Sequence, residues 1–171
     1  MRKTLLYVAV CLTGLGCAAV RADALDDSQI LGIYIQVNSF DIETALLARA
    51  QGDSAAVRNL ATHVAADHTG VRRMAYELAH KCRSLPTLPP ERGAVAAEHA
   101  SAMAKLSGLR GAEFDKEYLA REVAFHRAAI AAVKTTLLPA AHCAELKAHL
   151  QAVLPAFDGH LSQTEALAAK N

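Results

Sequence analysis

Apolar residues recur every three or four positions along almost the whole chain, and this spacing constrains the fold more than any other feature. A period near 3.6 places such residues on one face of an α-helix, whereas strands alternate with a period of two. Alanine is abundant, aromatic residues make up 5% of the chain and Trp is absent, which favours closely packed helices over sheets. We therefore predict an all-α fold.

Turn and capping residues divide this pattern into four long helices and one short one. The long helices are expected at about 28–50, from a cap at Asp53 or Ser54 to about 82, at about 112–138, and from Pro139 to about 167. The short helix is expected at about 91–107, after a Pro-rich connection. Pro155 lies inside the last helix and should kink it roughly one turn before His160.

Four long amphipathic helices bury their apolar stripes most simply as a four-helix bundle, with the short helix in a crossover. If the second and fourth helices run parallel, as in ferritin-like bundles, Cys82 and Cys143 fall at the same end. In an up-and-down bundle they would lie on the order of 40 Å apart. We therefore predict a ferritin-like bundle with a long crossover and a Cys82–Cys143 disulfide; two free buried thiols are the alternative.

The first 22 residues have the pattern of a secretory signal peptide. Arg2 and Lys3 precede an apolar run that contains no acidic residue, and Ala22 and Ala24 are candidate cleavage positions. The expected mature domain is 23–171, in the periplasm or cell envelope of a Gram-negative bacterium. An outer-membrane lipoprotein acylated at Cys17 is the alternative.

Charge and motifs exclude several classes of function. Lys and Arg number 18 against 17 Asp and Glu, with no basic stripe, so nucleic acid is not an expected partner. No second apolar span follows the signal, so we expect no transmembrane segment in the mature chain. No nucleophile elbow, phosphate loop or Cys-x-x-Cys motif is present, which argues against an enzyme; an envelope protein partner remains open.

Three histidines interrupt the apolar stripes, each on a different long helix: His68, His126 and His160. Imidazole is the commonest metal ligand, and a buried imidazole needs a partner. Glu122 lies one turn before His126, and Glu43 lies near the inner face of the first helix. These five residues are the candidate ligands of a divalent transition metal: zinc, iron, copper or nickel.

A purely structural polar core is the competing interpretation of the same histidines. The Glu-x-x-His motif of di-iron bundles is absent, because Ala65, Val123 and Phe157 stand three positions before the histidines. His63 and Asp67 are expected to form a solvated pair on the second helix. The remaining histidines show no convergent set: His80, His99, His142 and His149.

Several short motifs resemble one bacterial family in their order and spacing. They are Val57-Arg58-Asn59-Leu60-Ala61, Ala66-Asp67-His68-Thr69, Leu85-Pro86, Leu106-Ser107-Gly108, Phe114-Asp115-Lys116-Glu117-Tyr118, His126, Leu154-Pro155 and His160-Leu161. From about Asp27 to Leu167 the chain resembles the domain-of-unknown-function family 4142, often described as exported or outer-membrane proteins. The resemblance implies a ferritin-like fold and little about activity. Glu43, His68, His126 and His160 match the family's recurring positions, and Glu122 does not obviously do so.

Two functions are therefore expected. The first is an exported metal-binding or metal-sensing protein that uses His68, His126 and His160. The second is a non-catalytic envelope protein, acting in stress tolerance or through a partner, whose core histidines are structural.

Overall fold

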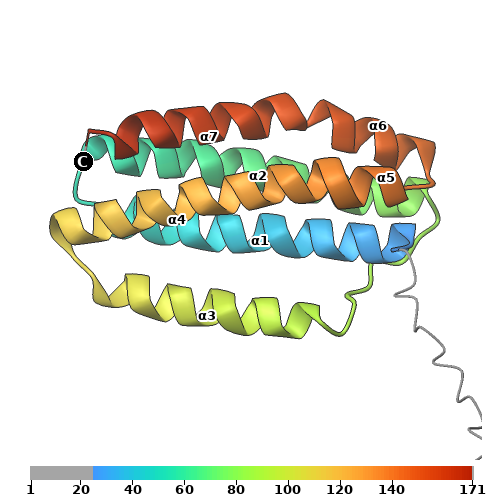
Figure 1. The fold of residues 1–171 in the computed structure, drawn as a ribbon, viewed down its shortest axis with the longest axis horizontal. Coiled ribbons are helices and arrows are strands. Elements are labelled where there is room, and N and C mark those ends of the chain that lie inside the picture. The colour runs from blue at the N-terminus through green and yellow to red at the C-terminus, as the bar shows by residue number, and fades with distance from the viewer. Residues whose placement is uncertain (1–24, 171) are drawn as a thin grey trace, which may run out of the picture.

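The computed structural model describes residues 25–170, and within them the chain forms helices and turns without any strand. The predicted signal peptide, its cleavage positions and Cys17 lie outside the described residues. Figure 1 shows the arrangement. The elements are α1 (Asp27–Gln51), α2 (Ala55–Lys81), α3 (Arg92–Gly108), α4 (Gly111–Ala132), the π-helical turn η1 (Val133–Leu137), α5 (Leu138–Ala140), α6 (Ala144–Ala152) and α7 (Leu154–Ala168).

Local hydrogen bonds explain where the first helices begin. Asp26 caps α1, and Gln29 returns a side-chain bond to the Asp26 backbone N–H, which forms a capping box. Ser54 caps α2 by accepting from the N–H of Val57. Both carboxylate oxygens of Asp115, on α4, accept from the backbone N–H groups of Asp53 and Ser54 at 2.8 Å. The α1–α2 turn is thus fastened to the start of α4.

The helices form a bundle in which α3 lies outside the main group (Figure 1). Helices α1 and α2 are antiparallel, and α4 is antiparallel to the α6–α7 segment. Helices α2 and α4 run in the same direction, because α3 returns the chain from one end of the bundle to the other between them. None of the helices between residues 25 and 170 has the length and hydropathy needed to cross a membrane.

The disulfide joins α2's end to the start of α6. Cys82 and Cys143 are bonded with a Cα–Cα distance of 5.8 Å, as the placement of both cysteines at one end of the bundle predicts. Asp27 fastens the same end, because its carboxylate accepts from the backbone N–H groups of His142 and Cys143 at 2.8 and 2.9 Å.

The last two long helices are less regular than the sequence pattern predicts. Helix α4 passes into the π-helical turn η1 instead of continuing to 138 as one α-helix. The final helix is divided at Val153, which ends α6 and precedes α7. Pro155 therefore stands in the first turn of α7, where its missing N–H removes no helical hydrogen bond. The break lies further from His160 than the one turn expected.

The apolar core consists of two separate clusters. One lies at the disulfide end and includes Ile30, Leu78, Ile130 and Leu146. The other lies at the end of the α1–α2 turn and includes Ala48, Leu60, Phe114 and Leu119. Apart from Asp115 near the start of α4, the buried polar residues of α1, α2, α4 and α7 fall between these stretches along each helix: Asn38, Asp41, Thr44, His68, Glu122, His126, His160 and Thr164. A polar layer thus crosses the bundle between two apolar ones.

Candidate metal centre

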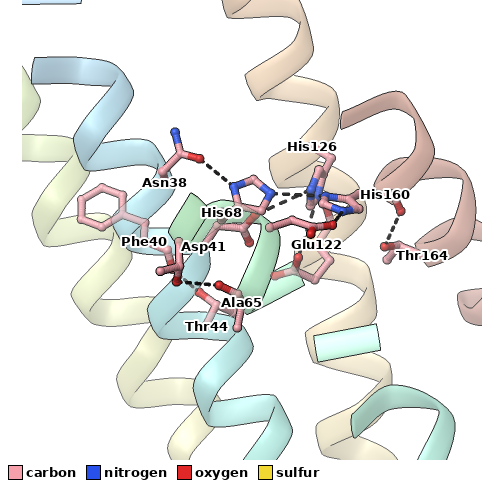
Figure 2. A network of polar contacts seen from close by, with 12 residues as sticks. Asn38, Phe40, Asp41, Thr44, Ala65, His68, Glu122, His126, His160 and Thr164 are labelled. Atoms are coloured by element: carbon pink, nitrogen blue, oxygen red, sulfur yellow. Dashed lines mark hydrogen bonds and ion pairs between the residues drawn. The ribbon is translucent and has the colours of Figure 1, made fainter. Parts of the chain in front are cut away.

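Each of the four main helices contributes a metal-ligating type of side chain to the polar layer (Figure 2). Helix α1 carries Asp41, α2 carries His68, α4 carries Glu122 and His126, and α7 carries His160. The exposed fractions of these five residues lie between 0 and 7%. The cluster therefore lies in the interior of the bundle, and each of the four main helices contributes at least one residue to it.

The three histidine rings form a nearly equilateral triangle. Their centroids are 5.6 Å apart for His68 and His126, 5.3 Å for His68 and His160, and 5.4 Å for His126 and His160. One nitrogen from each ring lies within 4.8 Å of the others. The closest pair is His68 Nε2 and His160 Nδ1 at 3.3 Å. The three predicted histidines therefore converge on one point.

Each ring donates a hydrogen bond to an oxygen outside the triangle. His68 Nδ1 lies 2.9 Å from Asn38 Oδ1, and the Asn38 amide is oriented because its Nδ2 donates to the Tyr34 carbonyl at 2.7 Å. His68 Nδ1 must therefore be the donor, which leaves Nε2 as the nitrogen with a free lone pair. This nitrogen is the one that faces His160 and the centre of the cluster.

The other two rings follow the same scheme. His126 Nδ1 donates to the backbone carbonyl of Glu122 at 3.0 Å, and His160 Nε2 donates to Asp67 Oδ2 at 2.9 Å. Outer hydrogen bonds of this kind fix the tautomer and the orientation of metal-ligating histidines. Asp67 thus bonds to His160 on α7, whereas the sequence suggested a solvated pair with His63.

Asp41 adds a carboxylate to the triangle. Its Oδ2 lies 2.9 Å from His68 Nε2 and 3.6 Å from His126 Nε2. Burial alone would raise the pKa of Asp41, but its close approach to His68 and His126 holds that pKa below its ordinary value. The side chain is therefore an anion in the interior, directly beside the inward nitrogens.

Several buried polar atoms of this layer have no hydrogen-bond partner within the described chain. They are both carboxylate oxygens of Asp41, Nε2 of His126, Oε2 of Glu122 and the hydroxyl of Tyr118. Leaving such atoms unsatisfied costs free energy. A cation between Asp41 and the inward nitrogens would satisfy the carboxylate and the His126 nitrogen together.

Glu122 lies against this anion and behaves differently from it. Burial raises the pKa of Glu122 well above its usual range, and the negative charge of Asp41 raises it further. Two buried carboxylates side by side share a proton for this reason. Glu122 Oε2 is also 3.7 Å from His126 Nδ1, the nitrogen that points away from the triangle. Glu122, Asp41 and His126 also offer ligand atoms that lie within 4.8 Å of one another, so Glu122 borders the histidine triangle on its Asp41 side.

The structure places Glu43 outside the cluster. Its carboxylate bonds to His99 of α3 at 2.9 Å, and its side chain is 57% exposed. His99 itself is buried. Its Nδ1 accepts a hydrogen bond from Arg121 at 3.0 Å, and its ring stacks on Phe40. His99 is thus buried in a second, separate polar contact, and His149 in a third, beside the hydroxyl of Tyr34 at 3.2 Å.

Sequence reasoning missed Asp41 because α1 buries residues on two sides. Val37 and Phe40, two apolar residues of this part of α1, lie on the side of α3 and are only partly buried. The side that faces the other main helices is marked by the spacing of Tyr34, Asn38, Asp41 and Ala45, all buried. Two polar residues within that second stripe were the available signal.

The spacing of the inward atoms suits a small ion. Ligands 2.0–2.1 Å from a tetrahedral zinc ion lie about 3.3 Å from one another. Three separations lie on either side of that value: 2.9 Å between Asp41 and His68, 3.3 Å between His68 and His160, and 3.6 Å between Asp41 and His126. Imidazole with a carboxylate suits zinc, iron, copper and nickel rather than magnesium or calcium.

Comparison with known proteins identifies the family of this chain and gives no biochemical activity. No curated protein and no solved structure is significantly similar to this chain. One family model matches residues 15–167, which is most of the sequence and includes every residue of the cluster. The chain belongs to the family described as Domain of unknown function (DUF4142).

Proposed function

We propose that this chain is an exported protein that binds one divalent transition-metal ion through Asp41, His68, His126 and His160. The observation that carries the proposal is the orientation of the rings. Each of the three imidazoles donates one N–H outward to an oxygen, so each directs its other nitrogen inward. In neutral rings this arrangement leaves three nitrogen lone pairs beside the Asp41 carboxylate, and one bound cation would stabilise all of them together.

A site with four protein ligands is closed, and closed sites hold a metal rather than react at it. Storage, buffering or sensing of the ion therefore fits the ligand set better than catalysis. We place the protein in the periplasm or envelope because of the signal-peptide pattern in residues 1–22, and we assign its bundle a ferritin-like connectivity because α2 and α4 run in the same direction (Figure 1).

The decisive experiment compares two acidic residues of α1. Protein purified without a metal-binding tag is loaded separately with zinc, iron, copper and nickel, dialysed, and analysed for bound metal by mass spectrometry. We expect one ion per chain for at least one metal, and loss of that ion in Asp41→Asn and His68→Ala. Glu43→Gln, on the same helix but beside His99, should retain it and is the matched control.

The competing function, a protein whose histidines are structural, gives a different result. In that case no metal reaches one equivalent in the unsubstituted protein, while His68→Ala still lowers thermal stability. Metal bound equally by the unsubstituted protein and Asp41→Asn would remove Asp41 from the ligand set. Retention by His68→Ala would refute the whole site.

A further inference from the structure

A long groove runs along α3 and α4, on the side of α4 away from the metal cluster. Its volume is about 650 Å³, which is within the range of small-molecule sites. Most of the residues that line it are apolar, and α1 contributes Val37 and Phe40 to one wall. Figure 1 shows α3 beside α1 and α4 along this side of the bundle.

Small side chains of α4 line the groove along much of its length. Ala120, Ala124, Ala128 and Ala132 line it at four-residue intervals on α4. At 1.5 Å per residue this row extends about 18 Å. Phe125 lies on the same helix and also lines the groove. A channel of this length with a flat alanine floor fits an extended chain better than a compact ring system.

Helix α3 is held in place without filling the groove. His99 and Leu106 are the buried residues of this helix. His99 links it to both neighbours, with Glu43 of α1 at 2.9 Å and Arg121 of α4 at 3.0 Å, and its ring stacks on Phe40 at 4.1 Å. His99 thus links α3 to both α1 and α4, and the apolar groove lies along the same side of α3.

A cation with unused donors lies at one end of the channel. Arg92, in the first turn of α3, lines the groove and donates from Nε to Gln36 Oε1 at 2.7 Å. Among the described residues no carboxylate forms an ion pair with it. Burial lowers the pKa of Arg92, and only the charge of Glu91 opposes this effect. Its terminal N–H groups match the two oxygens of a carboxylate.

The other charged residues of the wall are paired or solvated. Glu117 pairs with Lys105 at 2.6 Å, and Arg121 bonds to His99. Glu98 also lines the groove, further along α3 than Arg92, and is exposed to solvent. Arg92 is therefore the cation of the wall that has donors left for a bound anion.

We propose that this groove binds one long-chain aliphatic carboxylate, with its head group on Arg92 and its hydrocarbon chain along the alanine row of α4. The proposal is independent of the metal centre, since it shares no residue with it.

The test uses 11-(dansylamino)undecanoic acid, whose fluorescence reports entry into an apolar site, and displacement of this probe by dodecanoate. We expect saturable binding of one probe per chain. Arg92→Gln should weaken dodecanoate about tenfold, as expected for losing a charge-assisted hydrogen bond. Ala124→Leu should block the floor and abolish binding. Arg73→Gln, an exposed arginine of α2, and Ala131→Leu, an exposed alanine of α4 outside the groove, are the matched controls and should bind normally.

Three results would overturn the proposal. The first is absence of saturable probe binding by the unsubstituted protein. The second is binding that survives both Arg92→Gln and Ala124→Leu in variants with unchanged helical circular dichroism, since the ligand would then lie elsewhere. The third is a dimer that Ala124→Leu dissociates, because the groove would then be an interface between copies of the chain.

Discussion

At the scale of single residues, the polar layer contains two acidic groups with opposite responses to pH. The folded-state pKa of Asp41 lies below its ordinary value and that of Glu122 lies well above it. A lowered carboxyl pKa stabilises the fold above the ordinary value, and this contribution is lost as the pH falls through the folded pKa. A raised pKa has the reverse effect: its contribution is complete below the ordinary value and is lost as the pH rises through the folded one.

The first residue-scale prediction follows for Glu122→Gln in metal-free protein. The amide keeps the shape of the protonated acid but has no proton to lose, so it avoids the cost of ionising a buried carboxyl group. The variant should be close to the unsubstituted protein in stability at pH 4 and become relatively more stable as the pH rises, by about 1.4 kcal/mol for each pH unit between the ordinary carboxyl pKa and the raised folded pKa, with no further change above the folded pKa. Urea unfolding at several pH values measures this difference, and one that does not vary with pH would show that Glu122 is already ionised in the fold.

At the level of single residues, the sequence predicted the convergence of the three histidines and missed Asp41. An imidazole within an apolar stripe is visible in the sequence, and three of them on different helices indicated convergence. Asp41 and Glu43 are two positions apart on α1, so they differ by more than half a turn in direction. Choosing between them required knowing which side of α1 faces α3, and sequence periodicity cannot supply that when both sides are partly buried.

At the scale of elements, the connection between α2 and α3 packs directly on α1. The N–H of Thr87 donates to the carbonyl of Ser28 at 3.0 Å, and an added Cβ on Gly32 would collide with the Thr87 backbone. A glycine is therefore needed at position 32 because the Thr87 backbone lies so close to it. The helical backbone conformation of Gly32 does not itself require glycine.

The element-scale prediction contrasts two glycines inside helices. Gly32→Ala should destabilise the protein by about 1–3 kcal/mol, because the Thr87 backbone must move away. Gly70→Ala, in α2, adds a Cβ with no neighbour within 4 Å and should stabilise by about 0.5–1 kcal/mol through helix propensity. Denaturant unfolding of both variants measures the contrast. Equal stabilisation by the two alanines would mean that the segment between α2 and α3 does not pack against α1 at Gly32.

Helix positions followed from periodicity and capping, whereas irregularities within the helices did not. Ser54 and Gly52 mark the α1–α2 turn in both sequence and structure. The π-helical turn at Val133–Leu137 has no proline or glycine to signal it. The break at Val153 precedes Pro155 by two residues, because proline is accommodated in a first helical turn and the chain breaks where that turn must begin.

At the scale of the whole molecule, the disulfide and the proposed metal ion link the helices at different positions along the bundle. The disulfide closes a loop with a sequence separation of 61 at one end, while the proposed ion would join α1, α2, α4 and α7 in the middle. The choice of helix directions rested on the two cysteines, since helical stripes alone are compatible with either connectivity. Long-range covalent information therefore decided a question that local pattern could not.

The whole-molecule prediction is that the disulfide and the metal ion contribute independently to the free energy of unfolding. In the chain-entropy picture a loop of this size contributes about 4 kcal/mol, and a metal at a hundredfold excess over its dissociation constant contributes about 2.7 kcal/mol. The run of α2 from His68 to Cys82 spans about 21 Å, beyond the distance at which perturbations usually couple. Urea unfolding of the unsubstituted protein and of Cys82→Ser/Cys143→Ser, each with and without metal, should give metal increments that agree within about 0.5 kcal/mol.

A smaller metal increment in the disulfide-free protein would contradict independence. It would mean that the helix ends must be joined before Asp41 and the three histidines are aligned, so that part of the ordering cost of the site is met by the disulfide. His68→Ala separates this outcome from a failure to bind metal, because it should remove the metal increment in both backgrounds while leaving the contribution of the disulfide unchanged. Independence would instead show that the two apolar clusters on either side of the polar layer are sufficient to hold the four helices in register.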